Sequence, residues 1–483
     1  MLISVKKIFS LSPFLILLLS IFSVFISIIV NRNCFFVFYI TILFLISMIS
    51  TLPLVCNVIP VYITSLLYID FYSVIYIFLI LFSTIFMLCV SYFYLKKYFF
   101  YQEEFFLLIL CSIFGSMILV VSNHFFSVLI GMELMSVPFF GLMVYSISSN
   151  KISTMLKYII LSSFMTLLML SGIVIIYLIC GNLSFYSIKI FLLINNVCDR
   201  NILFLGLIFF LIPLFFKLSA FPFHFWMPNV YKHIDPILLI YSTTVMKISS
   251  FFVLLKIFSF FPYHQSHILY FLIKMMIILS IIFGSIMACF QDNIKKFFGY
   301  TSIVHMGYLL VTLLIVKKYN LSIFISFVYL MNYSMSNIGI FSILSVIKLM
   351  NPNFNYQFKD FYLYQSSILN KYFLNISMII FILSFLSFPF TLGFIAKILV
   401  ILIGMNKNFY FFNFIVLIQS AVSVCYYLKT ICIYFNYKKR FLTKRGHVSY
   451  SLLEFFVFLI SIVILVLGIF PQILFKIIQF NYI

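Results

Sequence analysis

Stretches of apolar residues, separated by short polar joins, occupy nearly the whole of this 483-residue chain. A helix needs about 20 apolar residues to cross the hydrocarbon of a bilayer, where every backbone polar group must be paired internally. Hydrophobic residues make up 65% of the chain and charged residues only 8%, which leaves no room for a water-soluble domain. The sequence therefore predicts an all-α polytopic membrane protein, with one integral domain over residues 1–483.

Cutting the chain at its polar joins gives about fourteen transmembrane helices. The first 20 residues have the charge-then-apolar order of a signal peptide but no small-residue cleavage site, so we expect this span to be retained. The predicted spans lie near 8–30, 34–56, 70–94, 104–121, 124–147, 154–180, 201–227, 235–259, 268–290, 297–316, 321–349, 372–405, 409–436 and 451–480.

Two of these spans carry a lysine beside a helix-breaking residue. The segment Pro213–Trp226, PLFFKLSAFPFHFW, contains Lys217 and Pro222, and the segment 383–397, LSFLSFPFTLGFIAK, has a proline and a glycine ahead of Lys397. An ammonium at the bilayer centre costs about 2.5–3.5 kcal/mol on insertion scales. Proline removes a helix hydrogen bond as well. A plain membrane anchor would carry neither feature.

Broken segments in the two halves of one chain are typical of transporters built from inverted repeats, with the ion path at the breaks. Lys397 follows Lys217 by 180 positions (397 − 217), and His305 follows Glu133 by 172 (305 − 133). Five spans occupy a similar length. We expect two inverted five-helix repeats, each with a broken helix, at about 104–259 and 268–436.

Four charged residues lie inside apolar spans and are candidates for proton transfer: Glu133, Lys217, Lys247 and Lys397. A carboxylate at such a depth is protonated, paired or in contact with water, and each state suits a proton relay. Lys217 is the expected partner of Glu133, and Lys247 has Ser and Thr neighbours that could relay protons. The alternative is that these charges form structural ion pairs that only hold helices together.

Other titratable residues have two interpretations each. His305, in YTSIVHMGYLL, could pass a proton near neutral pH or could be a packing residue with satisfied hydrogen bonds. Lys157 lies near a span end and could work inside the protein or extend to the membrane interface. Interfacial positions are expected for Lys256, Lys274 and Lys429.

The net charge of +21 is interpreted as a topology signal rather than as a nucleic-acid-binding surface, because the cations lie mostly in joins between spans. Joins on the side away from the termini carry about fourteen Lys and Arg residues against about eight on the other side. Both termini are thus predicted to lie outside the cytoplasm.

No sequence pattern for a bound cofactor or metal is present. The nine cysteines are scattered without a C-x-x-C pair, so disulfides, iron–sulfur ligation and zinc are not expected. Glycine-rich phosphate-binding motifs are also absent.

Several motifs, taken in order, resemble those of one family. They are GMELMSVPFFGL with Glu133, LKYIILSS with Lys157, FKLSAFPFHFWMPNVY with Lys217, TVMKIS with Lys247, QDNIKKFFGYTSIVHMGYLL with His305, FPFTLGFIAK with Lys397, and VCYYLK. The ordered set covers nearly the whole chain. It resembles the antiporter-like membrane subunits of proton-pumping NADH-quinone oxidoreductase, respiratory complex I, and most closely the subunit N family of gamma-proteobacteria.

The resemblance implies a fourteen-helix membrane-arm subunit that translocates protons, coupled to electron transfer from NADH to quinone. The family's proton-path glutamate falls on Glu133 and its lysines on Lys217, Lys247 and Lys397. FMN, iron–sulfur clusters, NADH and quinone would belong to other subunits, with no cofactor in this chain. Its partners would be the other membrane-arm subunits and the lipid bilayer. A bacterial cell inner membrane with both termini periplasmic is implied, with a mitochondrial inner membrane as the alternative.

The chain departs from the family pattern before the eighth span and in one loop. Asn229 replaces an acidic residue, Lys232 to Pro236 replace a Gly-Ala-Pro, and Asp292 replaces a threonine. Asp235 could restore a nearby acid.

Two other functions remain open at this stage. A subunit of a multi-subunit sodium/proton antiporter would share the fold. A structural membrane-arm scaffold would use the buried charges only for packing.

Overall fold

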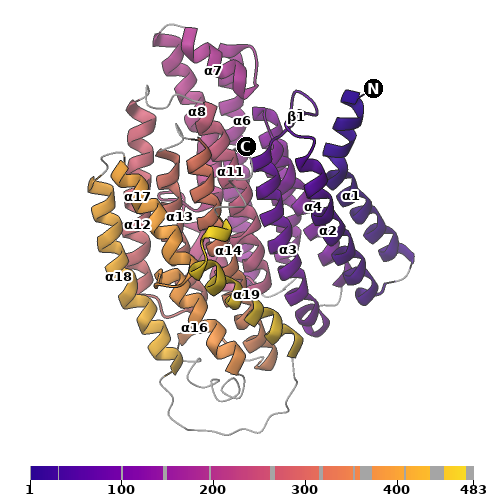
Figure 1. Ribbon diagram of the computed structural model, residues 1–483, viewed down its shortest axis with the longest axis vertical. Coiled ribbons are helices and arrows are strands. Elements are labelled where there is room, and N and C mark those ends of the chain that lie inside the picture. The colour runs from indigo at the N-terminus through magenta and orange to yellow at the C-terminus, as the bar shows by residue number, and fades with distance from the viewer. Residues whose placement is uncertain are drawn as a thin grey trace. The chain divides into compact units, whose positions relative to one another are not determined.

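A computed structural model of the protein describes residues 2–30, 32–98, 102–144, 149–194, 197–260, 267–314, 319–351, 354–358, 372–406, 410–435 and 451–474. Almost all of these residues are helical (Figure 1). The helices are α1 (Leu2–Val30), α2 (Cys34–Cys56), α3 (Phe71–Tyr98), α4 (Gln102–Val121), α5 (Phe125–Val144), α6 (Ser149–Cys180), α7 (Phe185–Ile194), α8 (Val197–Leu218), α9 (Trp226–His233), α10 (Pro236–Thr243), α11 (Val245–Phe260), α12 (His267–Cys289), α13 (Ile294–Val311), α14 (Tyr319–Met350), α16 (Tyr372–Leu386), α17 (Leu392–Asn406), α18 (Tyr410–Phe435) and α19 (Ser451–Ile469). One short hairpin pairs β1 (Val61–Tyr62) with β2 (Tyr68–Ile69).

The predicted spans are confirmed. Twelve helical stretches among the described residues are long and apolar enough to cross a bilayer, and each falls on a predicted span. The two remaining predicted spans are occupied by α16 with α17 and by α19, which are shorter apolar helices. The all-α polytopic fold follows directly from the spacing of polar joins.

The two predicted helix breaks are also present. Helix α8 ends at Leu218, and Ser219 has φ +60°; helix α16 ends at Leu386, and Ser387 has φ +64°. A residue in the left-handed region cannot continue a right-handed helix, so each serine ends its helix. The prolines that indicated the breaks lie two or three residues further on.

A third break lies inside the predicted span near 235–259. Helix α10 ends at Thr243 and α11 begins at Val245, with Thr244 between them. The Oγ1 atoms of Thr243 and Thr244 donate to carbonyls one turn back, at 2.7 Å each. Such hydroxyl bonds compete with the backbone ladder and bend helices. No proline or glycine marks this break in the sequence.

The structure consists of two compact units. The first comprises Met1–Leu218 and Val245–Leu272, and the second comprises Ser219–Thr244 and Ile273–Ile483. In the first unit α4 packs on α5, and α6 packs on α8; in the second, α14 packs on α10, α16 and α17. This division does not test internal symmetry, so the repeats at 104–259 and 268–436 and the single-domain organisation remain predictions.

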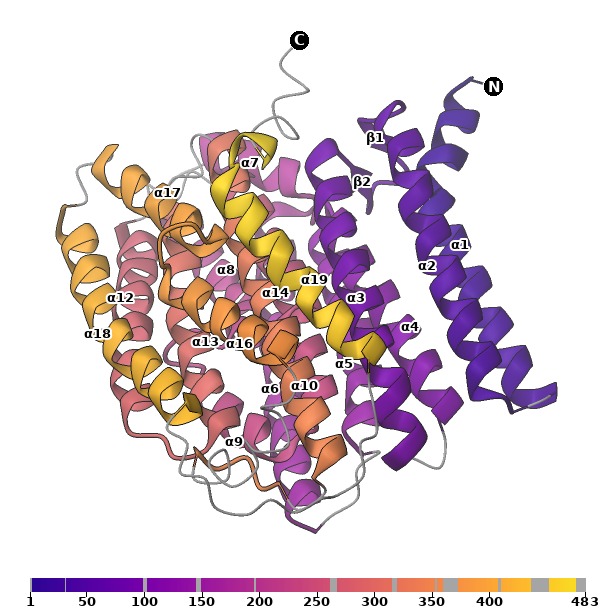
Figure 2. The same ribbon diagram turned by 60° about the horizontal axis from the view of Figure 1, so that its bottom comes forward.

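In the first unit, the joins after alternate spans meet at one end. The β1–β2 hairpin contacts α1 and lies beside its N-terminal part (Figure 2). Asn123 donates its backbone N–H to the Leu66 carbonyl at 3.0 Å, and Phe125 donates to the Leu183 carbonyl at 3.0 Å. These joins follow the second, fourth and sixth spans, so their meeting agrees with helices that alternate in direction.

Replacing Gly393 with alanine is expected to destabilise the protein by about 1–3 kcal/mol, because the new Cβ would collide with the Ser384 carbonyl at the second break. The measurement is thermal melting of the purified protein in detergent. Gly299→Ala is the matched control in the same unit, since the nearest atom to its Cβ would be a Tyr231 side-chain carbon at 3.4 Å. Equal melting of both variants would show that the close approach at Gly393 does not stabilise the break.

Candidate functional site

Lys217 lies in the last turn of α8, where the helix breaks, and only 4% of it is exposed. Its Nζ donates to the hydroxyl oxygen of Tyr158 on α6 at 3.3 Å. The same nitrogen lies 5.4 Å from the ring centroid of Tyr158 and 5.8 Å from that of Phe140. Two aromatic faces and one phenol thus take the place of water around this buried amine.

Glu133 is half-buried on α5 and acts electrostatically on Lys217. Among the ion pairs that the described residues form within 4 Å, none joins Glu133 to Lys217. Glu133 is therefore within electrostatic range of the amine but is not paired with it within 4 Å, and the Tyr158 hydroxyl accepts the hydrogen bond of the amine. A carboxylate that acts through space leaves the amine free to change its proton-bound state as the separation changes.

Lys247 lies in the first turn of α11, three residues after the Thr244 break, and none of it is exposed. The hydroxyls of Ser249 and Ser250 donate to helix carbonyls at 2.9 and 2.6 Å. Each of the three buried lysines at 217, 247 and 397 thus lies within two turns of a helix break. Breaks expose backbone polar groups, which are the only polar partners available at that depth apart from side chains.

In the second unit, His305 on α13 is held between two phenols. Its Nδ1 lies 2.8 Å from the hydroxyl of Tyr329 on α14, and its Nε2 lies 3.1 Å from that of Tyr427 on α18. In a neutral imidazole one ring nitrogen donates and the other accepts, so one phenol must accept while the other donates. The three side chains form a continuous hydrogen-bonded row from α14 to α18.

Lys397 lies on α17, one turn after Gly393, and is 7% exposed. Its Nζ is 5.1 Å from the ring centroid of Tyr308, whose ring centroid is 6.3 Å from that of His305. The second unit therefore places Lys397 and His305 beside the same tyrosine.

Sequence reasoning missed the tyrosines. Tyr158 contacts Lys217, and Tyr308 lies beside Lys397. Tyr329 and Tyr427 contact His305. All four tyrosines are at least 95% buried. The chain has 33 Tyr and 67 Phe, so composition gave no reason to single out these four. Their one signal is position: Tyr158 follows Lys157, and Tyr308 follows His305 by three residues.

Lys157 is exposed on α6, whereas its neighbour Tyr158 is fully buried. Adjacent helical residues point about 100° apart, so only one of the two can face the interior. The exposed side chain of Lys157 therefore does not join the buried group formed by Lys217, Tyr158 and Phe140.

The expected interfacial position is wrong for Lys256. Only 3% of this residue is exposed, and its Nζ donates to the Val120 carbonyl at 2.8 Å and lies 3.9 Å from Asp70 Oδ1. The Phe252 ring covers the amine at 5.1 Å. Lys256 therefore connects α11 to the last turn of α4 and to the start of α3. Lys429 is exposed and Lys274 is half-buried, and their interfacial positions remain predictions.

The departures from the family pattern lie at a polar end of the second unit. Asn229 is exposed on α9, and Asp235 occupies the position before α10 with Pro236 in the first helical position. Lys295, which is 2% exposed, donates to the Ile234 carbonyl at 2.6 Å and lies 3.6 Å from the Tyr356 ring centroid. The segment from Lys232 to Pro236, which departs from the family pattern, is thus stabilised by the buried Lys295.

The amino-acid sequence of this chain matches a known protein family. The family described as "NADH:quinone oxidoreductase/Mrp antiporter, TM" matches residues 122–423. Two relatives are the NADH-quinone oxidoreductase subunits N of Buchnera aphidicola subsp. Acyrthosiphon pisum (strain APS), 34% identical, and subsp. Schizaphis graminum (strain Sg), 36% identical. Each alignment covers 98% of this chain and 98% of the relative.

Solved structures share the fold at lower sequence identity. Respiratory complex I from Thermus thermophilus contains a chain with TM-score 0.75 and 21% identity, covering 99% of both chains. A chain of the membrane-bound sulfane sulfur reductase, an archaeal respiratory membrane complex, has TM-score 0.85 and 17% identity. A chain of the Mrp complex from Dietzia sp. DQ12-45-1b has TM-score 0.78 and 12% identity. The last two alignments each cover 98% of this chain and 96% of the other.

Lys256→Met is expected to destabilise the protein by about 1–3 kcal/mol, because it leaves the Val120 carbonyl and the Asp70 carboxylate without their cation. Thermal melting of the purified protein checks this. Lys256→Arg retains the charge and should recover most of the stability. Lys429→Met removes an exposed lysine and should melt as the wild type does; a Lys256→Met protein that did likewise would contradict the expectation.

Proposed function

The chain belongs to the NADH:quinone oxidoreductase/Mrp antiporter family, and we propose that it acts there as subunit N of NADH-quinone oxidoreductase. In this role it is a membrane-arm subunit that translocates protons. The observation that carries the assignment is 34–36% identity to named subunits N over 98% of both chains. The fold alone does not separate this role from a sodium/proton antiporter, because the Mrp chain has it too, but that chain is only 12% identical.

Proton translocation in this complex is coupled to electron transfer from NADH to quinone. We assign FMN, the iron–sulfur centres and the NADH and quinone sites to other subunits of the complex. The partners of this chain are then the other membrane-arm subunits and the surrounding lipid. A bacterial inner membrane, with both termini periplasmic, fits the distribution of basic joins.

In the first unit, we propose Lys217 as the group that takes up and releases the proton. Its amine hydrogen bond to Tyr158 holds it at the end of α8, within range of the Glu133 charge. A carboxylate that approaches an amine favours the ammonium, and one that withdraws favours the neutral amine. A small movement of α5 against α8 would therefore load or unload Lys217. Lys247, buried at the α10–α11 break, is proposed as the next carrier, and Lys157 as a residue of the outer approach.

In the second unit, His305 is proposed as the relay. Its ring can accept a proton on one nitrogen and release one from the other, so a proton arriving through one phenol leaves towards the second. Lys397 is the proposed terminal carrier, because it follows a helix break and lies beside Tyr308, whose ring is also near the imidazole. In this proposal both units transfer protons, the first through the Lys217 amine and the second through the His305 imidazole and Lys397.

Replacing Lys217 or Lys397 with alanine is expected to lower proton pumping and NADH-driven quinone reduction together, by about tenfold or more, since a loss of one proton carrier stalls a coupled cycle. The rates of proton pumping and of quinone reduction are measured in inverted membrane vesicles, and assembly of the complex is checked on a native gel. Lys429→Ala, which removes an exposed lysine, is the control. Normal assembly with both rates unchanged would contradict the proposed role of these lysines.

The scaffold alternative makes a different prediction for the same variants. Charges that only serve packing would, when removed, lower assembly and activity in proportion, with no change in protons moved per electron by the complexes that do assemble. Sodium transport without co-purifying flavin would instead favour the antiporter alternative.

Tyr427→Phe is expected to slow pumping while leaving assembly near normal, because it removes only the hydroxyl at 3.1 Å from His305 Nε2 and keeps the ring packing. General acid–base partners contribute about 100-fold or more to proton-transfer rates, so a clear drop should be measurable in vesicles. Tyr426→Phe removes the hydroxyl of the neighbouring tyrosine and serves as the control. Equal rates in the two variants would argue against a relay through Tyr427.

A further inference from the structure

A small pocket with polar walls lies in the second unit, at the end of α12. It has a volume of about 240 Å³. Its charged side chains are Lys232 from the last turn of α9, Asp292 from the join before α13, and Lys296 from the first turn of α13. The other lining residues are Phe290, Gln291, Asn293 and Gln357. All seven belong to the second unit.

The backbone around this pocket is fixed by hydrogen bonds. Phe358 donates its N–H to the Asp292 carbonyl at 2.9 Å. The side chain of Asn293 accepts from the Lys296 N–H at 3.2 Å and caps α13. These bonds use main-chain groups and an amide, so they do not occupy the charged ends of the lining side chains.

The three charged side chains are not paired with one another. Lys232 and Asp292 are exposed, and Lys296 is half-buried. Among the ion pairs within 4 Å in the part of the chain that the structure describes, none involves any of the three. The pocket therefore presents two ammonium groups and one carboxylate to a ligand.

Two of these charges lie where the chain departs from the family pattern. Lys232 begins the segment that replaces a Gly-Ala-Pro, and Asp292 replaces a threonine. The two positions are 60 residues apart (292 − 232) and line the same pocket. The charges of this pocket are thus a feature of this chain rather than of the shared fold.

An exposed apolar face of α12 leads to the pocket. Met275, Leu279 and Ile286 are 41%, 41% and 49% exposed. Phe290 follows the helix directly and is 77% exposed. The spacings of four, seven and four residues place these side chains on one side of a helix. Since Leu269–Cys289 is long and apolar enough to cross a bilayer, Phe290 belongs both to an exposed side of a membrane span and to the polar pocket.

The length of this face fits one acyl chain. Leu279 precedes Phe290 by eleven residues (290 − 279), which corresponds to about 16 Å along a helix. The hydrocarbon of a bilayer is about 30 Å thick, so one leaflet is about 15 Å deep. A lipid with its headgroup at Phe290 would have the end of its tail near Leu279.

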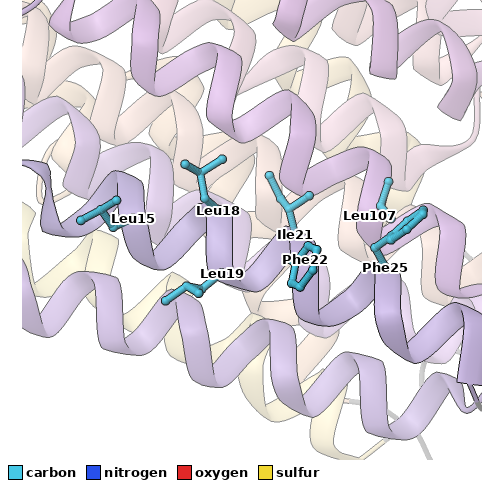
Figure 3. A pocket seen from close by; sticks show the side chains of 7 residues that line it. All are labelled: Leu15, Leu18, Leu19, Ile21, Phe22, Phe25 and Leu107. Atoms are coloured by element: carbon cyan, nitrogen blue, oxygen red, sulfur yellow. The ribbon is translucent and has the colours of Figure 1, made fainter.

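The larger groove on α1 has no such polar end. It has a volume of about 660 Å³, and its walls are Leu, Ile and Phe side chains of α1 together with Leu107 of α4 (Figure 3). A purely apolar surface can pack against lipid tails or against apolar helices alike, so it does not select a ligand. The pocket at Phe290 combines an apolar face with fixed charges, and such a combination is selective.

We propose that this pocket binds the headgroup of a phospholipid that carries a phosphate and a primary ammonium, as phosphatidylethanolamine does, while one acyl chain lies along α12. Lys232 and Lys296 bind the phosphate, since basic residues beside a membrane span attract lipid phosphates. Asp292 accepts charge-assisted hydrogen bonds from the ammonium. Phosphatidylcholine has the same phosphate, but its quaternary ammonium has no N–H to donate.

The site is tested with the whole complex, purified and placed in nanodiscs of phosphatidylcholine. The probe is a phosphatidylethanolamine with a photoreactive group at the end of one acyl chain, and peptide mapping should find its label on α12 near Leu279. Lys232→Ala/Lys296→Ala should lower this labelling about tenfold, which is the loss expected for charge-assisted hydrogen bonds. Lys232→Arg/Lys296→Arg is the matched control and should retain the label.

The headgroup is tested with a phosphatidylcholine probe that carries the same photoreactive chain. It should label α12 several-fold less than the phosphatidylethanolamine probe. Asp292→Ala should remove this difference, and Asp292→Glu should keep it. Equal labelling by the two lipids in the wild type, or unchanged labelling in the lysine double variant, would overturn the proposal.

Two further measurements separate a lipid from other occupants. A photoreactive amino acid at Ile286 should capture lipid, and capture of another protein subunit there would contradict the proposal. A large excess of soluble glycerophosphoethanolamine should leave the label in place, because it lacks the acyl chains; complete displacement would instead indicate a site for a soluble anion. All readouts measure binding without turnover, so they are independent of the proposed role in proton translocation.

Discussion

The hydrocarbon of the membrane requires every buried polar group to find a partner inside the protein, and the rest of this structure depends on that requirement. Lysine amines are tolerated at depth only where the fold supplies other polar or aromatic groups. Lys217 has a phenol and two rings, Lys397 has a tyrosine face, and Lys256 has a carbonyl and a carboxylate. The aromatic richness of the chain therefore has a structural use beyond filling space.

Helix breaks and buried cations occur together for the same reason. Each break ends a helix inside the membrane, which frees backbone groups and makes room for a long side chain at the same level. The two serine residues with positive φ and the threonine pair at residues 243 and 244 achieve this by different means. In each case a lysine lies within two turns of the break. A break without polar surroundings would be costly, and a lysine without a break would have fewer partners.

The two units use different chemistry for comparable tasks. The first holds an amine against a phenol, within electrostatic range of Glu133, and in our proposal the charge of the amine responds to the separation of helices. The second places an imidazole between two phenols, and in our proposal a proton passes along this row without a large movement. Lys256 has no such freedom, because its partners are a backbone carbonyl and a helix-capping carboxylate, Asp70, which accepts from the Ser73 N–H.

The sequence by itself determined the fold class, the approximate positions of the spans, and two of the three breaks. These depend on local composition: about 20 apolar residues predict a span, and proline or glycine beside lysine predicts a break. It also identified Lys217, Lys397 and His305 as buried centres. Only the tertiary structure decided their partners. Tyr158 is 59 positions from Lys217, and Tyr427 is 122 positions from His305, so no local pattern could join them. The burial of Lys256 and the exposure of Lys157 likewise depend on which helices pack against each face, and hydropathy along one helix does not contain that information.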